Sequence, residues 1–113
     1  FNGAVQEGFG FYQTTTRNGS RCSSATAYLD PIRGKRANLK IITGAMARKV
    51  LFEGRRASGV LYTTAAGAFA EAASREVILC GGAINSPQLL MLSGLGPAAH
   101  LRQKGIEVRV DLP

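Results

Sequence analysis

One segment of this sequence, Gly82 to Gly96, combines glycine, serine and proline in an order that can position a ligand. It reads GAINSPQLLMLSGLG and follows an apolar run that ends at Cys80. Ser86 and Pro87 predict a helix start, since a serine hydroxyl accepts a free backbone N–H and proline costs little at the first helical position. Such a helix start offers N–H donors to a phosphate. The same residues also fit a plain strand–turn–helix unit, which the pattern alone favours.

No other segment shows a recognisable catalytic set. The dinucleotide fingerprint G-x-G-x-x-G is absent, because Gly8 and Gly10 are followed by Gln13 where the third glycine would stand. His100 is the single histidine and has no acid or nucleophile beside it in the sequence. Acid–base catalysis needs partners within hydrogen-bond reach, so we predict no catalytic residue in this chain.

The two cysteines predict no metal site. Cys22, Cys80 and His100 together offer three ligands, whereas a structural zinc site takes four. We expect both thiols to be reduced and buried or half-buried, with Cys80 facing a core, although the sequence leaves a disulfide open.

Charge and length limit the class of protein further. The net charge is +7, but the basic residues are scattered, and the densest run (Arg33, Lys35, Arg36, Lys40) lacks a nucleic-acid-binding motif. We therefore predict solvated loop charges and no nucleic-acid partner. The 113 residues fit one domain with one core, and no apolar run is long enough for a transmembrane helix. The chain starts at Phe1 without a targeting signal, so we expect a piece of a longer protein, cytoplasmic by default.

The elements that must position the Gly82–Gly96 segment form a β-rich middle and a helical end. The predicted strands are Phe9–Thr16, Leu39–Thr43, Arg48–Glu53, Ala57–Thr64, Ala70–Ser74 and Glu76–Cys80, the last covered on both faces. The predicted turns are Asn18-Gly19, Gly54–Arg56 and Ala65–Gly67, whose short spacing favours antiparallel hairpins.

Three helices complete the predicted elements. A short one covers Ala25–Leu29, capped by Ser23 or Ser24 and ended by Asp30-Pro31. The second runs from Ser86 to Gly94 and is apolar on nearly every side, so it should be buried. The third runs from Pro97 to Gly105, with Leu101 and Ile106 placed to close its glycine-capped end, and Val108–Leu112 is extended.

The Gly82–Gly96 segment resembles the second signature of the glucose–methanol–choline (GMC) oxidoreductases, in their choline dehydrogenase-like branch. The matching positions are Gly82, Ala83, Ser86, Pro87, Leu89, Leu90, Ser93, Gly94, Leu95 and Gly96. The resemblance continues in TRNGSRCSSATAYLDP, NLKIITGAMARKVLFE, REVILCGGAINSPQLL and GIEVRVDLP, and so covers nearly the whole chain.

The resemblance implies an FAD-dependent enzyme that oxidises the CH–OH group of a small-molecule alcohol. The family's glycine fingerprint and its catalytic histidine correspond to sequence outside this chain, and His100 does not match that histidine. We therefore expect an internal fragment that is inactive alone. The alternative is a stand-alone basic binding or scaffolding domain derived from the same fold.

The resemblance also implies which residues contact FAD. Ala47 corresponds to a residue, often valine in relatives, whose backbone contacts adenine. Gly81, Gly82 and Ala83 correspond to a small-residue turn near the cofactor, where relatives often carry alanine in place of Gly81. Asn85 and Ser86 follow at the helix start. Each of these residues also has a purely structural interpretation, as a strand residue, a tight turn or a helix cap.

The expected fold is α/β, a fragment of an FAD-binding Rossmann-like domain with an antiparallel β-meander and C-terminal helices. Residues 1–113 would form a single domain, part of the FAD-binding domain, with residues 1–30 near its boundary with the substrate domain. Phe9, Phe11 and Tyr12 could face that boundary, but core packing is the simpler expectation. A fragment keeps exposed apolar surface, so we expect the isolated chain to form homo-oligomers or partly rearranged strand pairings.

Overall fold

The computed structural model describes residues 3–113, so Phe1 and Asn2 lie outside the described residues. The chain separates into two compact units, one ending at Ile41 and the other running from Ile42 to Pro113.

A small hairpin is the first regular structure of the unit that ends at Ile41. In it, β1 (Thr16–Arg17) pairs antiparallel with β2 (Ser20–Arg21). The two residues between the strands, Asn18 and Gly19, have φ angles of 51° and 73°. Asn-Gly is the pair that best tolerates this left-handed geometry in a two-residue hairpin. The turn predicted at Asn18-Gly19 is confirmed.

A single short helix follows the hairpin. It is a π-helix, η1 (Ala25–Leu29), with Asp30 at its C-terminal end. The Oγ of Ser23 accepts the backbone N–H of Thr26 at 3.2 Å, whereas Ser24 makes no side-chain cap bond. The helix and the Ser23 cap are confirmed.

Three predicted strands do not form, two of them before β3. Phe9–Thr16 is irregular except for Thr16, and Phe9 and Phe11 are 111% and 98% exposed rather than packed in a core. Tyr12 is also exposed, and Leu39–Thr43 is irregular. A strand needs a neighbour for its ladder hydrogen bonds, and no strand among residues 3–113 pairs with the irregular parts of these segments.

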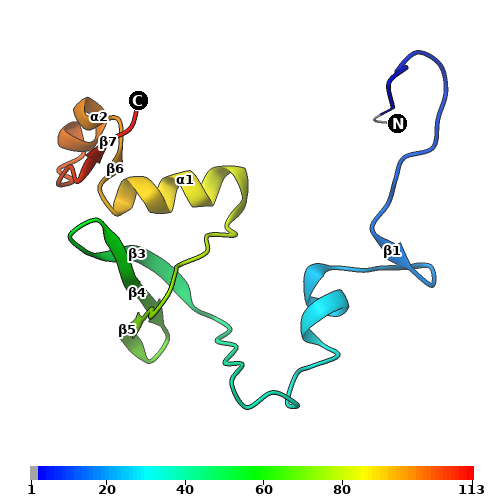
Figure 1. Cartoon of the computed structure of the whole chain (residues 1–113), viewed down its shortest axis with the longest axis horizontal. Helices are drawn as coiled ribbons and strands as arrows, with labels where there is room; N and C mark the ends of the chain where they lie inside the picture. Colours follow the sequence, from blue (N-terminus) through cyan, green and yellow to red (C-terminus); the bar gives the residue numbers. More distant parts are fainter. Residues whose placement is uncertain (1–2) are drawn as a thin grey trace. The chain divides into compact units, whose positions relative to one another are not determined.

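The unit from Ile42 onwards is built on a three-stranded antiparallel sheet, drawn in green in Figure 1. The sheet contains β3 (Met46–Glu53), β4 (Arg56–Thr64) and β5 (Gly67–Ala72), paired in the order β3-β4-β5. Tight turns join them, as predicted. The strands and hairpins are confirmed, although β5 begins before the predicted Ala70.

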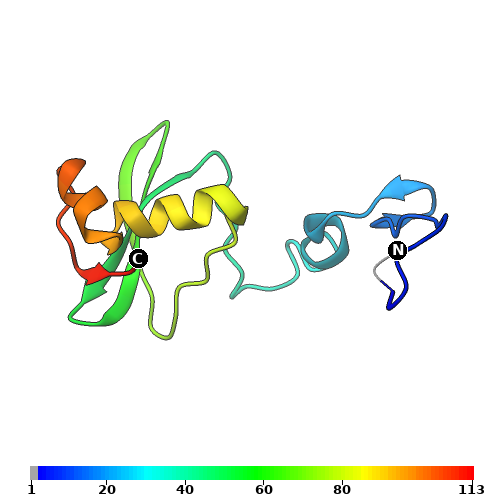
Figure 2. The same ribbon diagram turned by 90° about the horizontal axis from the view of Figure 1, so that it is seen from above.

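The helix α1 (Gly82–Leu92) packs against β3, which is an edge strand of the sheet (Figure 2). The core gathers near the end of this helix, where Val50, Ser93, Ala98 and Leu101 are buried. The helix itself is not buried on every side, because Leu92 is 44% exposed. That prediction was wrong: the helix meets the sheet along one side only.

The chain ends in a small α/β arrangement. Here β6 (Leu95–Gly96) pairs in parallel with β7 (Val110–Asp111), and α2 (Ala98–Gln103) connects them. The Oδ1 of Asp111 accepts the N–H of Ala98 at 2.8 Å and so caps α2.

The C-terminal end of α2 has the predicted glycine cap. Ile106 N–H bonds to the carbonyl of Leu101 at 2.9 Å, and Gly105 N–H bonds to that of Arg102 at 3.0 Å. Gly105 has φ 70°, the left-handed conformation that this type of helix end requires. The predicted stop at Gly105 is confirmed.

The segment before α1 differs from its prediction. Glu76–Cys80 forms no strand, Ile78 is 73% exposed, and Cys80 is exposed instead of facing a core. Within residues 3–113 no strand lies beside this apolar run, and only Val77 and Leu79 are half-buried, so the segment is not covered on both faces as predicted.

The start of α1 also lies earlier than predicted. The N-cap residue is Gly81 rather than Ser86, and Pro87 lies inside the helix. Ser86 still satisfies a backbone donor, because its Oγ accepts the N–H of Gly81 at 2.9 Å. Gly82 has φ 81°, which lets the chain turn into the helix well before the proline.

Candidate functional site

An open pocket of about 360 Å³ lies between the beginning of β3 and α1, within the unit that starts at Ile42. Its lining residues are Met46, Ala47, Leu79, Cys80, Gly81, Asn85, Ser86, Gln88, Leu89 and Leu92. The strand supplies one side, and the helix with the segment before it supplies the other.

Four of the six residues predicted to contact a cofactor line this pocket. They are Ala47, Gly81, Asn85 and Ser86, brought together although Ala47 is far from the others in sequence. Gly82 and Ala83 lie in the first turn of α1 and are exposed, outside the lining. The pocket thus joins the two parts of the sequence that were predicted separately.

The lining has the chemistry of a site for an uncharged group. Lys, Arg, Asp and Glu do not occur among its residues. Asn85 and Gln88 carry amides that donate and accept hydrogen bonds, and Met46, Leu89 and Leu92 supply apolar surface. A phosphate is less suited to this pocket, because no cation lines it and the N–H of Gly81 already bonds to Ser86.

Sequence reasoning missed Met46, Leu79, Cys80, Gln88, Leu89 and Leu92 as lining residues. Placing the helix start correctly would have found Gln88, because it lies three positions after Asn85 on the same side of a helix. Cys80 was missed because its apolar neighbours indicated burial in a core. No signal in the sequence singles out Met46.

A second hollow, of about 540 Å³, lies in the other unit. Its lining residues, Val5 to Gly10 and Tyr12, come from one irregular stretch of chain. No helix or strand holds these side chains in place, so this hollow lacks the rigid support that a binding site needs.

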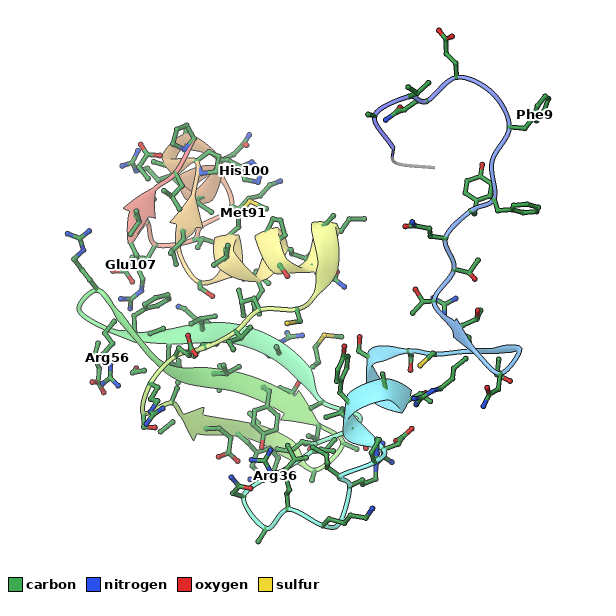
Figure 3. The ribbon with its side chains drawn as sticks, turned by 45° about the vertical axis from the view of Figure 1, so that its right-hand side comes forward. Phe9, Arg36, Arg56, Met91, His100 and Glu107 are labelled. Atoms are coloured by element: carbon green, nitrogen blue, oxygen red, sulfur yellow. The ribbon has the colours of Figure 1, made fainter. Side chains whose placement is uncertain are left out.

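The described residues contain no group of three or more His, Cys, Asp and Glu side chains able to hold a metal ion. His100 lies on α2 and is exposed, away from the pocket lining (Figure 3). Cys22 and Cys80 are free cysteines, and Cys22 is half-buried as predicted. The helices of the described region are too short or too polar to cross a bilayer.

Solved structures share this fold. Pyridoxine 4-oxidase from Mesorbium loti matches with a TM-score of 0.78 and 37% identity, covering 87% of this chain and 19% of that protein. An FAD-dependent oxidoreductase from Chaetomium thermophilum matches with a TM-score of 0.68 and 36% identity, covering 74% of this chain and 15% of that protein. The fold is therefore that of part of an FAD-binding α/β domain, as the sequence predicted.

The family model described as GMC oxidoreductase matches residues 1–110, and this chain belongs to that family. Among curated relatives, the oxygen-dependent choline dehydrogenase of Brucella anthropi is 50% identical over 113 residues. The match covers 100% of this chain but 20% of that relative, so the chain spans about a fifth of the length of the curated proteins it matches.

Proposed function

We propose that this chain is part of an FAD-dependent oxidoreductase that acts on the CH–OH groups of alcohols, with choline as the first candidate substrate. The observation that carries the proposal is the 50% identity to oxygen-dependent choline dehydrogenase along the entire chain. On this proposal, residues 1–113 form part of the FAD-binding domain, and the substrate-binding residues belong to the rest of the enzyme.

We further propose that the pocket between β3 and α1 holds a flat ring of FAD. The small residues Ala47 and Gly81 line the pocket, and the amides of Asn85 and Gln88 can bond to the polar edge of a ring. Gly82, Ala83 and Ser86 act by shaping the turn and the helix start. When bound, FAD supplies the acceptor for the hydride that leaves the alcohol carbon.

The 113-residue chain alone should show no alcohol oxidation. Its one histidine is exposed on α2, outside the pocket, and no Asp, Glu, Lys or His of the described residues lines that pocket. The test compares this chain with the longest protein that the surrounding reading frame encodes, using choline-dependent reduction of a dye. We expect FAD absorbance and dye reduction from the longer protein and only the buffer rate from the chain.

Two results would count against this proposal. Stop codons directly bracketing these residues would favour a stand-alone binding or scaffolding role. A longer protein that binds FAD but oxidises no alcohol in a substrate panel would disprove the assigned reaction while leaving the cofactor intact.

The rate at which a maleimide labels the exposed thiol of Cys80 should show whether FAD occupies the pocket. Cys80 lines the pocket, so bound FAD should shield it from a maleimide. With free FAD at about ten times the dissociation constant, we expect labelling to be about tenfold slower. Mass spectrometry of the Cys80 peptide measures this rate, with the Cys22 peptide as the internal control. Equal labelling of Cys80 with and without FAD would place the cofactor elsewhere.

We also propose that the exposed apolar side chains favour association of the isolated chain. In the second unit, Met46, Ile78 and Ile84 are 62%, 73% and 80% exposed, and such side chains favour association where they gather into a patch.

A further inference from the structure

The two sides of the pocket come from elements that are far apart in sequence, and their separation sets the width of the pocket. Met46 and Ala47 lie at the beginning of β3, whereas Asn85, Gln88 and Leu89 lie on α1. Whatever fixes α1 against β3 therefore fixes the binding surface.

Ser93 forms a joint between these two elements. Its Oγ accepts the backbone N–H of Val50 in β3 at 2.8 Å and donates to the carbonyl of Leu89 in α1 at 2.6 Å. Ser93 is 1% exposed and Val50 is 3% exposed, so water cannot replace either bond. Leu89 itself lines the pocket, and Val50 lies three residues after the pocket residue Ala47 in β3.

The pairing of β3 with β4 is irregular on both sides of this joint, although Val50 itself pairs with Val60. The register shifts between Ala47 and Lys49 and again between Leu51 and Phe52, so Val50 lies between two irregularities. A register shift leaves a residue unpaired and bends its strand. On its other side β3 is a sheet edge, which the Ser93 hydroxyl meets at Val50.

We propose that Ser93 is a positioning residue for the flavin pocket: it holds α1 against β3 so that Ala47 and the amides of Asn85 and Gln88 face one bound ring. This inference rests on the proposed function, because it assumes that the pocket holds part of FAD. Ser93 does not line the pocket and acts through Val50 and Leu89.

The test compares Ser93→Ala with Asp111→Ala in the longest protein that the reading frame encodes. Asp111 makes a matched bond, since its Oδ1 also accepts a backbone N–H at 2.8 Å, but it caps α2 and lies outside the pocket. Both variants should lower the melting temperature. We expect only Ser93→Ala to raise the FAD dissociation constant, by about tenfold, because it removes the one hydrogen bond of Ser93 that joins α1 to β3.

Hydrogen exchange provides a readout that does not depend on FAD. In Ser93→Ala the amides of Met46 to Val50 should exchange faster than in Asp111→Ala, and Ser93→Thr, which keeps the hydroxyl, should restore slow exchange and FAD affinity. Equal loss of FAD affinity in Ser93→Ala and Asp111→Ala would overturn the positioning role. A wild-type protein that binds no FAD would instead refute the proposed function, and slow exchange of β3 in Ser93→Ala would refute the joint itself.

Discussion

Gly94→Ala should destabilise the second unit by roughly 3 kcal/mol, one of the two largest effects expected of a single substitution in this chain. Gly94 has φ 91°, which an L-residue adopts only at a cost of about 1–2 kcal/mol. An added Cβ would also lie 2.6 Å from the carbonyl oxygen of Glu107 and 3.0 Å from Cγ of Arg109. The first contact is with backbone, which cannot rotate away.

The hydrogen bonds of Gly94 explain why strain at this residue would disturb the neighbouring strands. The carbonyl of Gly94 accepts the N–H of Arg109 at 2.8 Å and that of Val110 at 3.2 Å, so the glycine links the end of α1 to the start of β7. Glu107 lies in the connection between α2 and β7 (Figure 3). Moving either backbone to make room would break the parallel β6–β7 pair.

Gly105→Ala is the matched control for Gly94→Ala. Gly105 also follows a helix and has φ 70°, but an added Cβ there would meet nothing within 4 Å. It should therefore cost only about 1 kcal/mol, from the backbone conformation alone. Urea unfolding followed by circular dichroism measures both values. If the two variants lose the same free energy of unfolding, the contact with Glu107 does not constrain Gly94.

The parts of the fold that could be predicted from the sequence are those decided by neighbouring residues. Asn18-Gly19 predicts its turn because only a few residue types accept positive φ at both positions. Gly105 and Ile106 predict the end of α2 for the same kind of reason, since a glycine there completes a short set of local hydrogen bonds. The three strands of the sheet follow from hairpins with short turns.

The parts that could not be predicted depend on distant partners. Glu76–Cys80 has the composition of a covered strand, yet composition does not say whether a neighbouring strand is present to pair with it. The strand predicted at Leu39–Thr43 does not form for the same reason. At Ser86, two local signals competed: the proline favoured a late start, and Gly82, with φ 81°, allowed an earlier one.

The candidate site was predictable only in part. The residues on α1 belong to one continuous motif, so the sequence can indicate them together. Ala47 came from a resemblance, because nothing in its own type or spacing relates it to Asn85. The pocket that joins them exists because α1 packs on β3, which is a tertiary contact and has no local signal.

Gly59→Ala should break the pairing of β4 with β5 at a cost of about 2–3 kcal/mol. Gly59 is buried and pairs with Ala72, and an added Cβ would lie 2.4 Å from the carbonyl oxygen of Glu71. It would also lie 3.4 Å from Cα of Ala72. The obstacle is the backbone of the neighbouring strand, so the two strands must separate locally.

The expected separation of β4 and β5 has a local signature. The N–H of Ala73 bonds to the carbonyl of Ser58 at 2.8 Å, beside the Gly59–Ala72 pair, so its exchange should quicken first. Tyr62 and Phe69, whose rings stack 5.7 Å apart, lie nearer the hairpin turn and should keep their contact. Ser58→Ala is the control, since it changes the adjacent side chain without adding bulk toward β5. Unchanged exchange at Ala73 in Gly59→Ala would mean that the sheet tolerates a side chain here, and that Gly59 is not what allows β5 to approach β4.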